Sequence, residues 1–169
     1  MVKQTWRSSA CRFAYVLLLC LATVACAANS GVVMHSFSFD ARKDSPDVEI
    51  LDYRYGDSKQ PSARAPDWAI KQNQAPQWTN ITSEMLRPDS LYVRWRVKST
   101  GEIHEDTVDL RSRLPADIKD HRVYFIARGR QLYIYLITPE RRAPESAPKG
   151  PSMYQHLKSI TIYPDAGKQ

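Results

Sequence analysis

The feature that most constrains the fold is a strict alternation of apolar and polar side chains over residues 91–98. A period of two residues is that of a β-strand with one buried face, because successive side chains on a strand point to opposite sides. We therefore predict a half-buried strand here. Its apolar positions are Leu91, Val93, Trp95 and Val97, and its polar positions are Tyr92, Arg94, Arg96 and Lys98.

Similar runs recur along the chain, and no segment has a convincing helical period. The runs lie at residues 32–40, 48–55, 102–110 and 156–163, and on both sides of a turn at Gly129-Arg130. This pattern predicts an all-β fold, an antiparallel β-sandwich or a partly closed barrel of six to seven strands. We expect one β domain over residues 32–164 and a flexible tail over 165–169.

Two hairpins follow from the turn signals. Around residues 99–101 two registers remain open, because a two-residue loop would pair Arg96 with Glu105, whereas a three-residue loop ending at Gly101 would pair Arg94 with Asp106. Gly129-Arg130 suits a type II′ turn, whose first position favours glycine. That turn pairs Ala127 with Leu132, Phe125 with Ile134 and Val123 with Leu136.

Two stretches are rich in proline and lack periodicity. Residues 56–88 are predicted to form a long irregular loop, with short helical signals at 67–72 or 83–86, because proline removes an amide donor and disfavours helix in the residue before it. Residues 139–152 are predicted to form a long, basic connection before the last strand.

Residues 1–25 have the form of a bacterial signal peptide. Lys3, Arg7 and Arg12 precede an apolar run over residues 13–25, and a positive region followed by a short apolar region is typical of an export signal. A comfortable membrane span needs about 20 apolar residues, more than this run provides. We expect the segment to be removed.

The end of this segment, Thr23-Val24-Ala25-Cys26, resembles the lipobox of bacterial lipoproteins, with Thr23 where leucine is usual. The resemblance implies that Cys26 is the lipid-modified first residue of the mature protein and that residues 26–31 include a short tether. Ala27 after the cysteine implies sorting to the outer membrane, facing the periplasm. Cleavage at an ordinary signal-peptidase site, such as Ala25-Cys26-Ala27, would instead give a soluble periplasmic protein.

Cysteine usage agrees with lipidation. The chain contains Cys11, Cys20 and Cys26, and the first two would leave with the signal. The mature chain would then hold one thiol, at its first position, which excludes an internal disulfide. Thioether lipidation would protect that thiol from oxidation in the exported compartment.

Charge and motifs argue against several functions. The signal holds three of the 24 basic residues, which leaves 21 against 18 acidic ones, too balanced for a nucleic-acid partner. The histidines, His35, His104, His121 and His156, form no zinc motif, and neither a nucleophile elbow nor a phosphate-binding loop occurs. We therefore predict no metal, no cofactor and no enzymatic activity. The alternative is an envelope hydrolase that uses two convergent carboxylates.

Aromatic residues supply one candidate binding surface. Tyr124, Tyr133 and Tyr135 share a face of the second hairpin and could form a recognition surface. Burial of this face under residues 56–88 or a second sheet is favoured, because large exposed apolar patches are rare in monomers. Trp68 and Trp78 close the related segments Ala65-Pro66-Asp67-Trp68 and Ala75-Pro76-Gln77-Trp78. They either clamp a ligand or, as we favour, fold back onto the sheet.

Basic loop residues supply a second candidate surface. Arg128, Arg130, Arg141 and Arg142 are predicted to contact an anion or a partner. Residues 123–126 and 133–142 resemble small uncharacterised proteobacterial envelope proteins, some of which are encoded beside type VI secretion genes. The resemblance implies an immunity or accessory role toward a secreted toxin. Our leading hypothesis is a non-enzymatic lipoprotein, anchored in the membrane, that binds another envelope protein.

Overall fold

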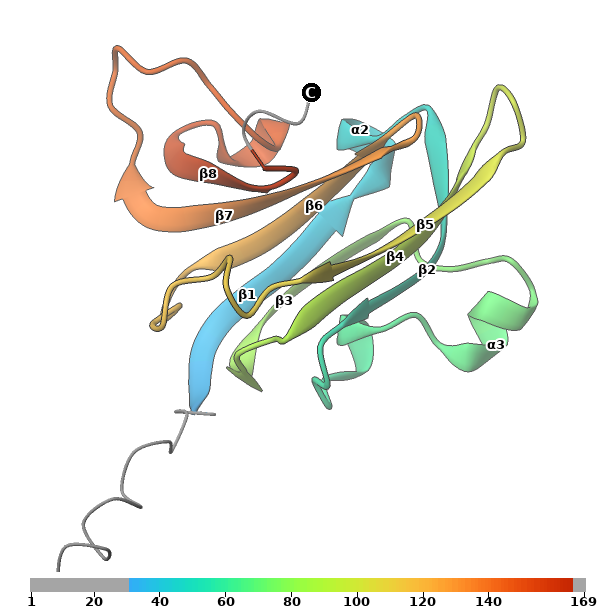
Figure 1. Cartoon of the computed structure of the whole chain (residues 1–169), viewed down its shortest axis with the longest axis horizontal. Coiled ribbons are helices and arrows are strands. Elements are labelled where there is room, and N and C mark those ends of the chain that lie inside the picture. Colours follow the sequence, from blue (N-terminus) through green and yellow to red (C-terminus); the bar gives the residue numbers. More distant parts are fainter. Residues whose placement is uncertain (1–30, 166–169) are drawn as a thin grey trace, which may run out of the picture. The chain divides into compact units, whose positions relative to one another are not determined.

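Two β-sheets pack face to face in the computed structural model, which describes residues 31–165. Within this part the strands are β1 Val32–Asp40, β2 Val48–Tyr55, β3 Trp78–Leu86, β4 Ser90–Val97, β5 Ile103–Asp109, β6 Arg122–Arg128, β7 Gln131–Arg141 and β8 Leu157–Tyr163. The larger sheet has the order β3-β1-β6-β7-β8 and the smaller β2-β4-β5 (Figure 1). The short helices are α2 Ala41–Asp44, η1 Pro61–Ala63, α3 Asp67–Lys71 and η2 Ser152–Tyr154.

The predicted β-sandwich is confirmed, and the two sheets do not close into a barrel. Two details differ from the prediction. The described residues form eight strands, whereas six to seven were predicted. The additional strand is β3, which lies inside the stretch predicted to be irregular. The pairing of β1 with β6 is parallel, with Ser36 opposite Arg122, whereas only antiparallel pairs were predicted. The predicted signal peptide, Cys26 and the tether up to residue 30 lie outside the described residues.

One hairpin has its predicted register and the other does not. Between β6 and β7 the predicted pairs are all present, and Gly129 has a φ of +52°, which glycine adopts without strain. Between β4 and β5, Arg94 pairs with Glu105, so both predicted registers are wrong. The connecting loop has four residues, Lys98–Gly101, because the Val97 N–H donates to the Glu102 carbonyl.

Aromatic side chains join the two sheets. Phe37 of β1 stacks on Tyr55 of β2 with ring centroids 4.3 Å apart. Phe39 stacks on Phe125 at 4.4 Å and meets Tyr53 edge-on at 4.8 Å. These distances are typical of favourable aromatic pairs. All five rings are at most 2% exposed, so this cluster forms the centre of the core.

Residues 60–77 seal one open side of the sandwich, where the edges of β2 and β3 face each other. The Gln77 side chain acts as a strand partner for Ile50: Oε1 accepts the Ile50 N–H at 2.9 Å, and Nε2 donates to the Ile50 carbonyl at 2.8 Å. Ser62 O accepts the Thr79 hydroxyl at 3.2 Å. Helix α3 confirms the predicted helical signal at 67–72, whereas residues 83–86 belong to β3.

Replacing Gln77 with alanine should destabilise the fold. The Ile50 N–H and carbonyl would lose their partners, and an unpaired buried polar group costs about 1–3 kcal/mol. Urea unfolding of Gln77→Ala should therefore give a lower free energy of unfolding than wild type. Gln74→Ala, in the same segment but exposed, should stay close to wild type. Equal stabilities for the two variants would refute this role of Gln77.

His35 is buried on the inner side of β1. Its side chain is 1% exposed, and its Nδ1 lies 2.8 Å from the Val33 carbonyl oxygen. Its Nε2 and the hydroxyl of the neighbouring Tyr55 have no hydrogen-bond partner among the described residues. Desolvation by burial lowers the pKa of His35 below its ordinary value. The imidazole is therefore held in its neutral form.

This burial predicts that the fold weakens as the medium becomes acidic. Below about pH 6.5 the unfolded chain protonates His35 while the folded chain does not, so stability falls by up to about 1.4 kcal/mol per pH unit. Urea unfolding between pH 7.5 and 5.5 should show this slope in wild type. The slope should be shallower in His35→Gln, whereas the exposed-site variant His156→Gln should keep it. A His35→Gln slope equal to that of wild type would contradict the prediction.

Candidate functional site

Trp78, the first residue of β3, carries an exposed indole ring. The residue is 53% exposed, and the Arg42 guanidinium lies 5.2 Å from the ring centroid, within the range of a cation–π contact. Asp40 lies opposite Trp78 in the β1–β3 register and holds Arg42 by two bonds. Nε donates to Oδ1 at 2.9 Å, and Nη2 donates to Oδ2 at 3.1 Å. The three side chains form one positioned cluster.

The local sequence explains why this ring points outward. Gln77 is turned inward by its bonds to β2, and Thr79 is 6% exposed. Because side chains alternate along a strand, Trp78 must face the other way. Asp40 also caps α2 by accepting the Arg42 N–H, and its hydrogen bond to the Arg42 side chain lowers the pKa of the Asp40 carboxyl. The aspartate therefore stays ionised beside the arginine.

Three loops lie at the same end of the sandwich as this cluster. Asp47 Oδ2 accepts the Gly129 N–H at 2.9 Å, and the Gly129 carbonyl accepts the Trp95 indole N–H at 2.7 Å. These bonds tie Asp47 and the loop 128–130 to the buried Trp95. We call this region the tryptophan end; it comprises residues 40–47, Trp78, and the loops 98–101 and 128–130.

A hollow of about 600 Å³ opens at the tryptophan end. Its buried carboxylate, Asp44, is fully occupied, because Oδ2 accepts the Tyr124 hydroxyl at 2.7 Å and Oδ1 accepts the Ser152 N–H at 3.0 Å. Two exposed cations, Lys43 and Arg128, line the same hollow. The carboxylate therefore holds the wall of the hollow, while the cations are accessible from outside.

Trp68 is exposed as well. It lies on α3 and is 60% exposed, so the favoured prediction that both tryptophans fold back onto the sheet is wrong. In the two related segments the inward residues are alanines, since Ala65 is 0% and Ala75 is 4% exposed. Small side chains fit where the chain passes close to the sheet.

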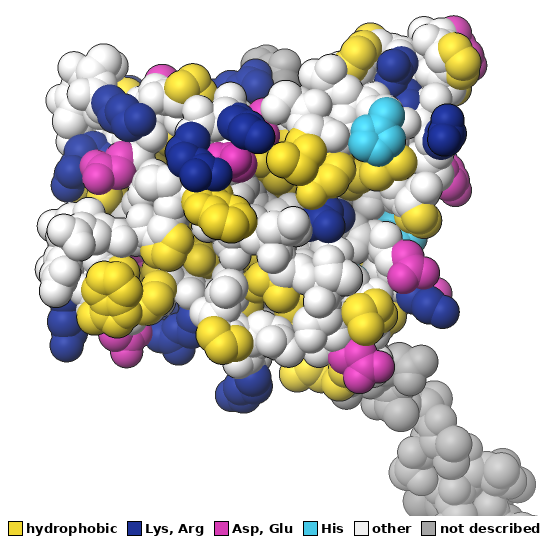
Figure 2. All heavy atoms as spheres, turned by 180° about the vertical axis from the view of Figure 1, so that it is seen from behind, with side chains coloured by type: hydrophobic (Ala, Val, Ile, Leu, Met, Phe, Trp, Pro, Cys, Tyr) yellow, Lys and Arg dark blue, Asp and Glu magenta, His cyan; other side chains and the backbone are white. Residues whose placement is uncertain are grey.

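Figure 2 shows hydrophobic side chains on one face of the molecule in separate groups, interspersed with Lys and Arg.

The predicted tyrosine surface is buried. Tyr124 is 3% and Tyr135 is 9% exposed, which confirms the favoured prediction of burial for both and contradicts the alternative of a recognition surface, whereas Tyr133 is half-buried. The cover is neither residues 56–88 nor the second sheet but the proline-rich segment 142–155. The ring of Tyr154 packs edge-on against Tyr124 at 5.9 Å. Burial raises the pKa of Tyr124, which keeps its hydroxyl protonated as a donor to Asp44.

Gly150 allows this segment to lie close to the sheet. It has a φ of +78°, and a Cβ atom there would come within 2.8 Å of the Ser159 Oγ and 3.3 Å of the Tyr135 ring. Both the conformation and the space require glycine. The position of Gly150 therefore fixes how the basic connection crosses the outer face of β7 and β8.

The predicted basic contacts fall into different environments. Arg128 is exposed at the hollow described above. Arg130 is paired with Glu102 at 2.6 Å. Arg141 and Arg142 line a second hollow of about 640 Å³, at the junction of β7 and β8.

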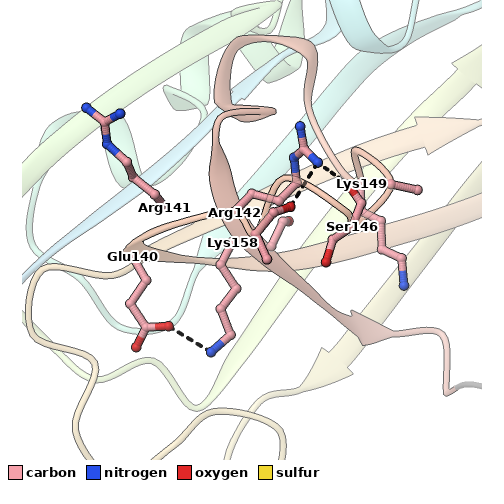
Figure 3. A pocket seen from close by; sticks show the side chains of 9 residues that line it. Glu140, Arg141, Arg142, Ser146, Lys149 and Lys158 are labelled. Carbon is pink, nitrogen blue, oxygen red and sulfur yellow. Dashed lines mark hydrogen bonds and ion pairs between the residues drawn. The ribbon is translucent and has the colours of Figure 1, made fainter.

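The cations of this second hollow do not converge. Arg142 donates to the backbone carbonyls of residues 143, 146 and 155, so it holds the connection in place. Lys158 pairs with Glu140 at 2.7 Å. Figure 3 shows Arg141 and Lys149 pointing to opposite sides of the pocket. Arg142 therefore has a structural role, and the arrangement does not form a cradle for a single anion.

Metal and membrane features can be stated for residues 31–165. In this part no group of three or more His, Cys, Asp or Glu side chains is placed to hold a metal ion. Over the same range no helix has the length and apolar character needed to cross a bilayer. The predicted lipidation residue, Cys26, precedes this range.

The sequence analysis did not identify Arg42 as a site residue. Its only sequence signal, the Asp40 cap before a four-residue helix, is also typical of an ordinary polar turn.

The chain has no match among protein-family models, curated proteins or solved structures. The functional argument therefore rests on the geometry of this molecule.

Replacing Tyr124 with phenylalanine should loosen the cover over the sheet. The buried Asp44 would lose one of its two donors, which should cost about 1–3 kcal/mol of stability. Hydrogen exchange should show faster exchange in residues 143–155 of Tyr124→Phe. Tyr133→Phe is the matched control, because the Tyr133 hydroxyl makes no hydrogen bond among residues 31–165 and its loss should change little. Unchanged exchange in Tyr124→Phe would show that the Tyr124 hydroxyl does not hold the segment.

Proposed function

We propose that this chain is an exported lipoprotein, held by Cys26 to the outer membrane and facing the periplasm, and that it binds another envelope protein through the tryptophan end. The observation that carries the proposal is the exposed Trp78 ring beside the fixed Arg42 guanidinium. Tryptophan and arginine dominate the binding energy of protein interfaces. A side chain that is already positioned loses less entropy when a partner binds.

The form of the surface favours a macromolecular partner. Trp78 stands on the surface and does not line either of the two hollows described above. A small molecule needs a pocket that encloses most of its surface, whereas a protein partner can cover a projecting ring. The exposed Lys43 and Arg128 at the same end of the sandwich would supply further polar contacts to such a partner. These groups bind, and the proposal assigns no catalytic step to them.

Lipidation is supported by the sequence. Thr23-Val24-Ala25-Cys26 resembles a lipobox, and no cysteine follows Cys26 in the chain. The test is incorporation of labelled palmitate into the full-length protein expressed with its own signal. Wild type should be labelled and Cys26→Ser should not. Equal labelling of the two, or none in wild type, would contradict the lipid anchor.

Partner binding is tested by affinity capture of the lipidated protein with envelope extract. Trp78→Ala should reduce recovery of the partner about 30-fold, the effect of losing about 2 kcal/mol at a central interface residue. Trp68→Ala removes a similarly exposed tryptophan elsewhere, 60% against 53% exposed, and is the matched control. Full recovery by Trp78→Ala, or no specific partner for wild type, would overturn the proposal. Recovery of a secreted toxin would identify the immunity role that the resemblance of residues 123–126 and 133–142 implies.

A further inference from the structure

A small apolar patch lies at the other end of β1 from Trp78. Val32 is 60%, Met34 40% and Leu86 42% exposed. Val32 pairs directly with Leu86, and Met34 lies two residues further along the same strand, so the three side chains share one face of the sheet. That face is the outer one, because the intervening Val33 packs toward the core. We call these three residues the proximal patch.

The patch lies where the domain meets the proposed anchor. Val32 begins β1, and only residues 27–31 separate it from Cys26. Five extended residues span at most about 18 Å. A domain of this size has a radius of gyration of about 14 Å, so its diameter exceeds the length of the tether. The tether therefore holds the start of β1, and with it the proximal patch, within about 18 Å of the lipid-bearing residue.

We propose that the proximal patch rests on the phospholipid surface in which Cys26 is anchored, an inference that depends on the lipidation proposed above. Val32, Met34 and Leu86 enter the interfacial layer, where burial of apolar side chains is favourable. β1 and β3 then lead away from the membrane, and their far end carries Trp78. The eight steps of about 3.3 Å from Val32 to Asp40, which pairs with Trp78, place Trp78 roughly 26 Å along the strand from Val32.

The size of the patch argues against a protein as its occupant. A stable protein interface uses about 20–30 residues on each side, and the patch consists of three. A bilayer can accept a few side chains without a complementary shape. Glu84 lies opposite Met34, so the patch carries no excess of positive charge. The contact should therefore depend on apolar insertion, and adding salt should weaken it little.

Single-cysteine labelling tests this contact in the full lipidated protein. The chain has no cysteine after Cys26, so Met34→Cys and Leu86→Cys each introduce one reactive thiol into the domain. Each variant is labelled with an environment-sensitive nitrobenzoxadiazole dye and reconstituted into phosphatidylethanolamine–phosphatidylglycerol vesicles. Ile103→Cys is the matched control, because Ile103 is 46% exposed and begins β5, just after the loop 98–101 of the tryptophan end.

Dye at positions 34 and 86 should show a several-fold rise and a blue shift of emission in vesicles, which persist in high salt, while dye at 103 should not. Emission at 34 and 86 equal to that at 103, in protein whose mass confirms the acyl groups, would overturn the membrane contact and leave the anchor intact. A change that grows with the number of proteins per vesicle would indicate a second copy on the patch and would also overturn it. Absence of the acyl mass would overturn the anchor and this inference together.

Discussion

The aromatic contacts between β1 and β2 are the interaction on which the rest of the structure depends. Phe37 stacks on Tyr55 across the gap between the sheets, and Phe39 meets both Tyr53 and Phe125. Because β1 lies between β3 and β6 in the larger sheet, this cluster holds an inner strand against the smaller sheet. Trp78 and the proximal patch lie at opposite ends of the β1–β3 pair. Their separation therefore depends on a strand that the core holds in place.

Local patterns predicted the parts of the fold that bury one face and follow a short turn. The β6–β7 register follows from Gly129 and from apolar residues on both sides of it. The β4–β5 register could not be predicted, because the turn signals favoured a loop of two or three residues, whereas the loop has four. The longer loop shifts every β4–β5 pair without changing the alternation of apolar and polar residues along either strand. β3 was missed because its inward positions include Thr79 and Ser83, which bond to residues 60–62 instead of joining an apolar core. The parallel β1–β6 pair is a long-range contact without a local signal.

The sequence identified the two tryptophans as candidate site residues but did not predict that their rings are exposed. Trp68 and Trp78 were identified, yet nothing local to either tryptophan distinguishes a ring that covers a sheet from one that faces solvent. The decision is made by Ala65, Ala75 and Gln77, which take the inward positions. The favoured prediction that the tyrosine face is buried was correct. The cover was predicted to be residues 56–88 or the second sheet, but it is the segment 142–155. That segment is held by Asp44, which lies 108 residues before Ser152, and by bonds of Arg142 within the segment itself.

The pairing of β1 with β3 also determines how the molecule would carry mechanical force. The nine residue pairs run without interruption from Val32 and Leu86 to Asp40 and Trp78. A pull between the start of β1 and a partner on Trp78 would load these pairs along the strand axis. All the hydrogen bonds of the ladder would then resist together instead of opening one after another. The β1–β3 pair would thus be loaded in shear between its two ends.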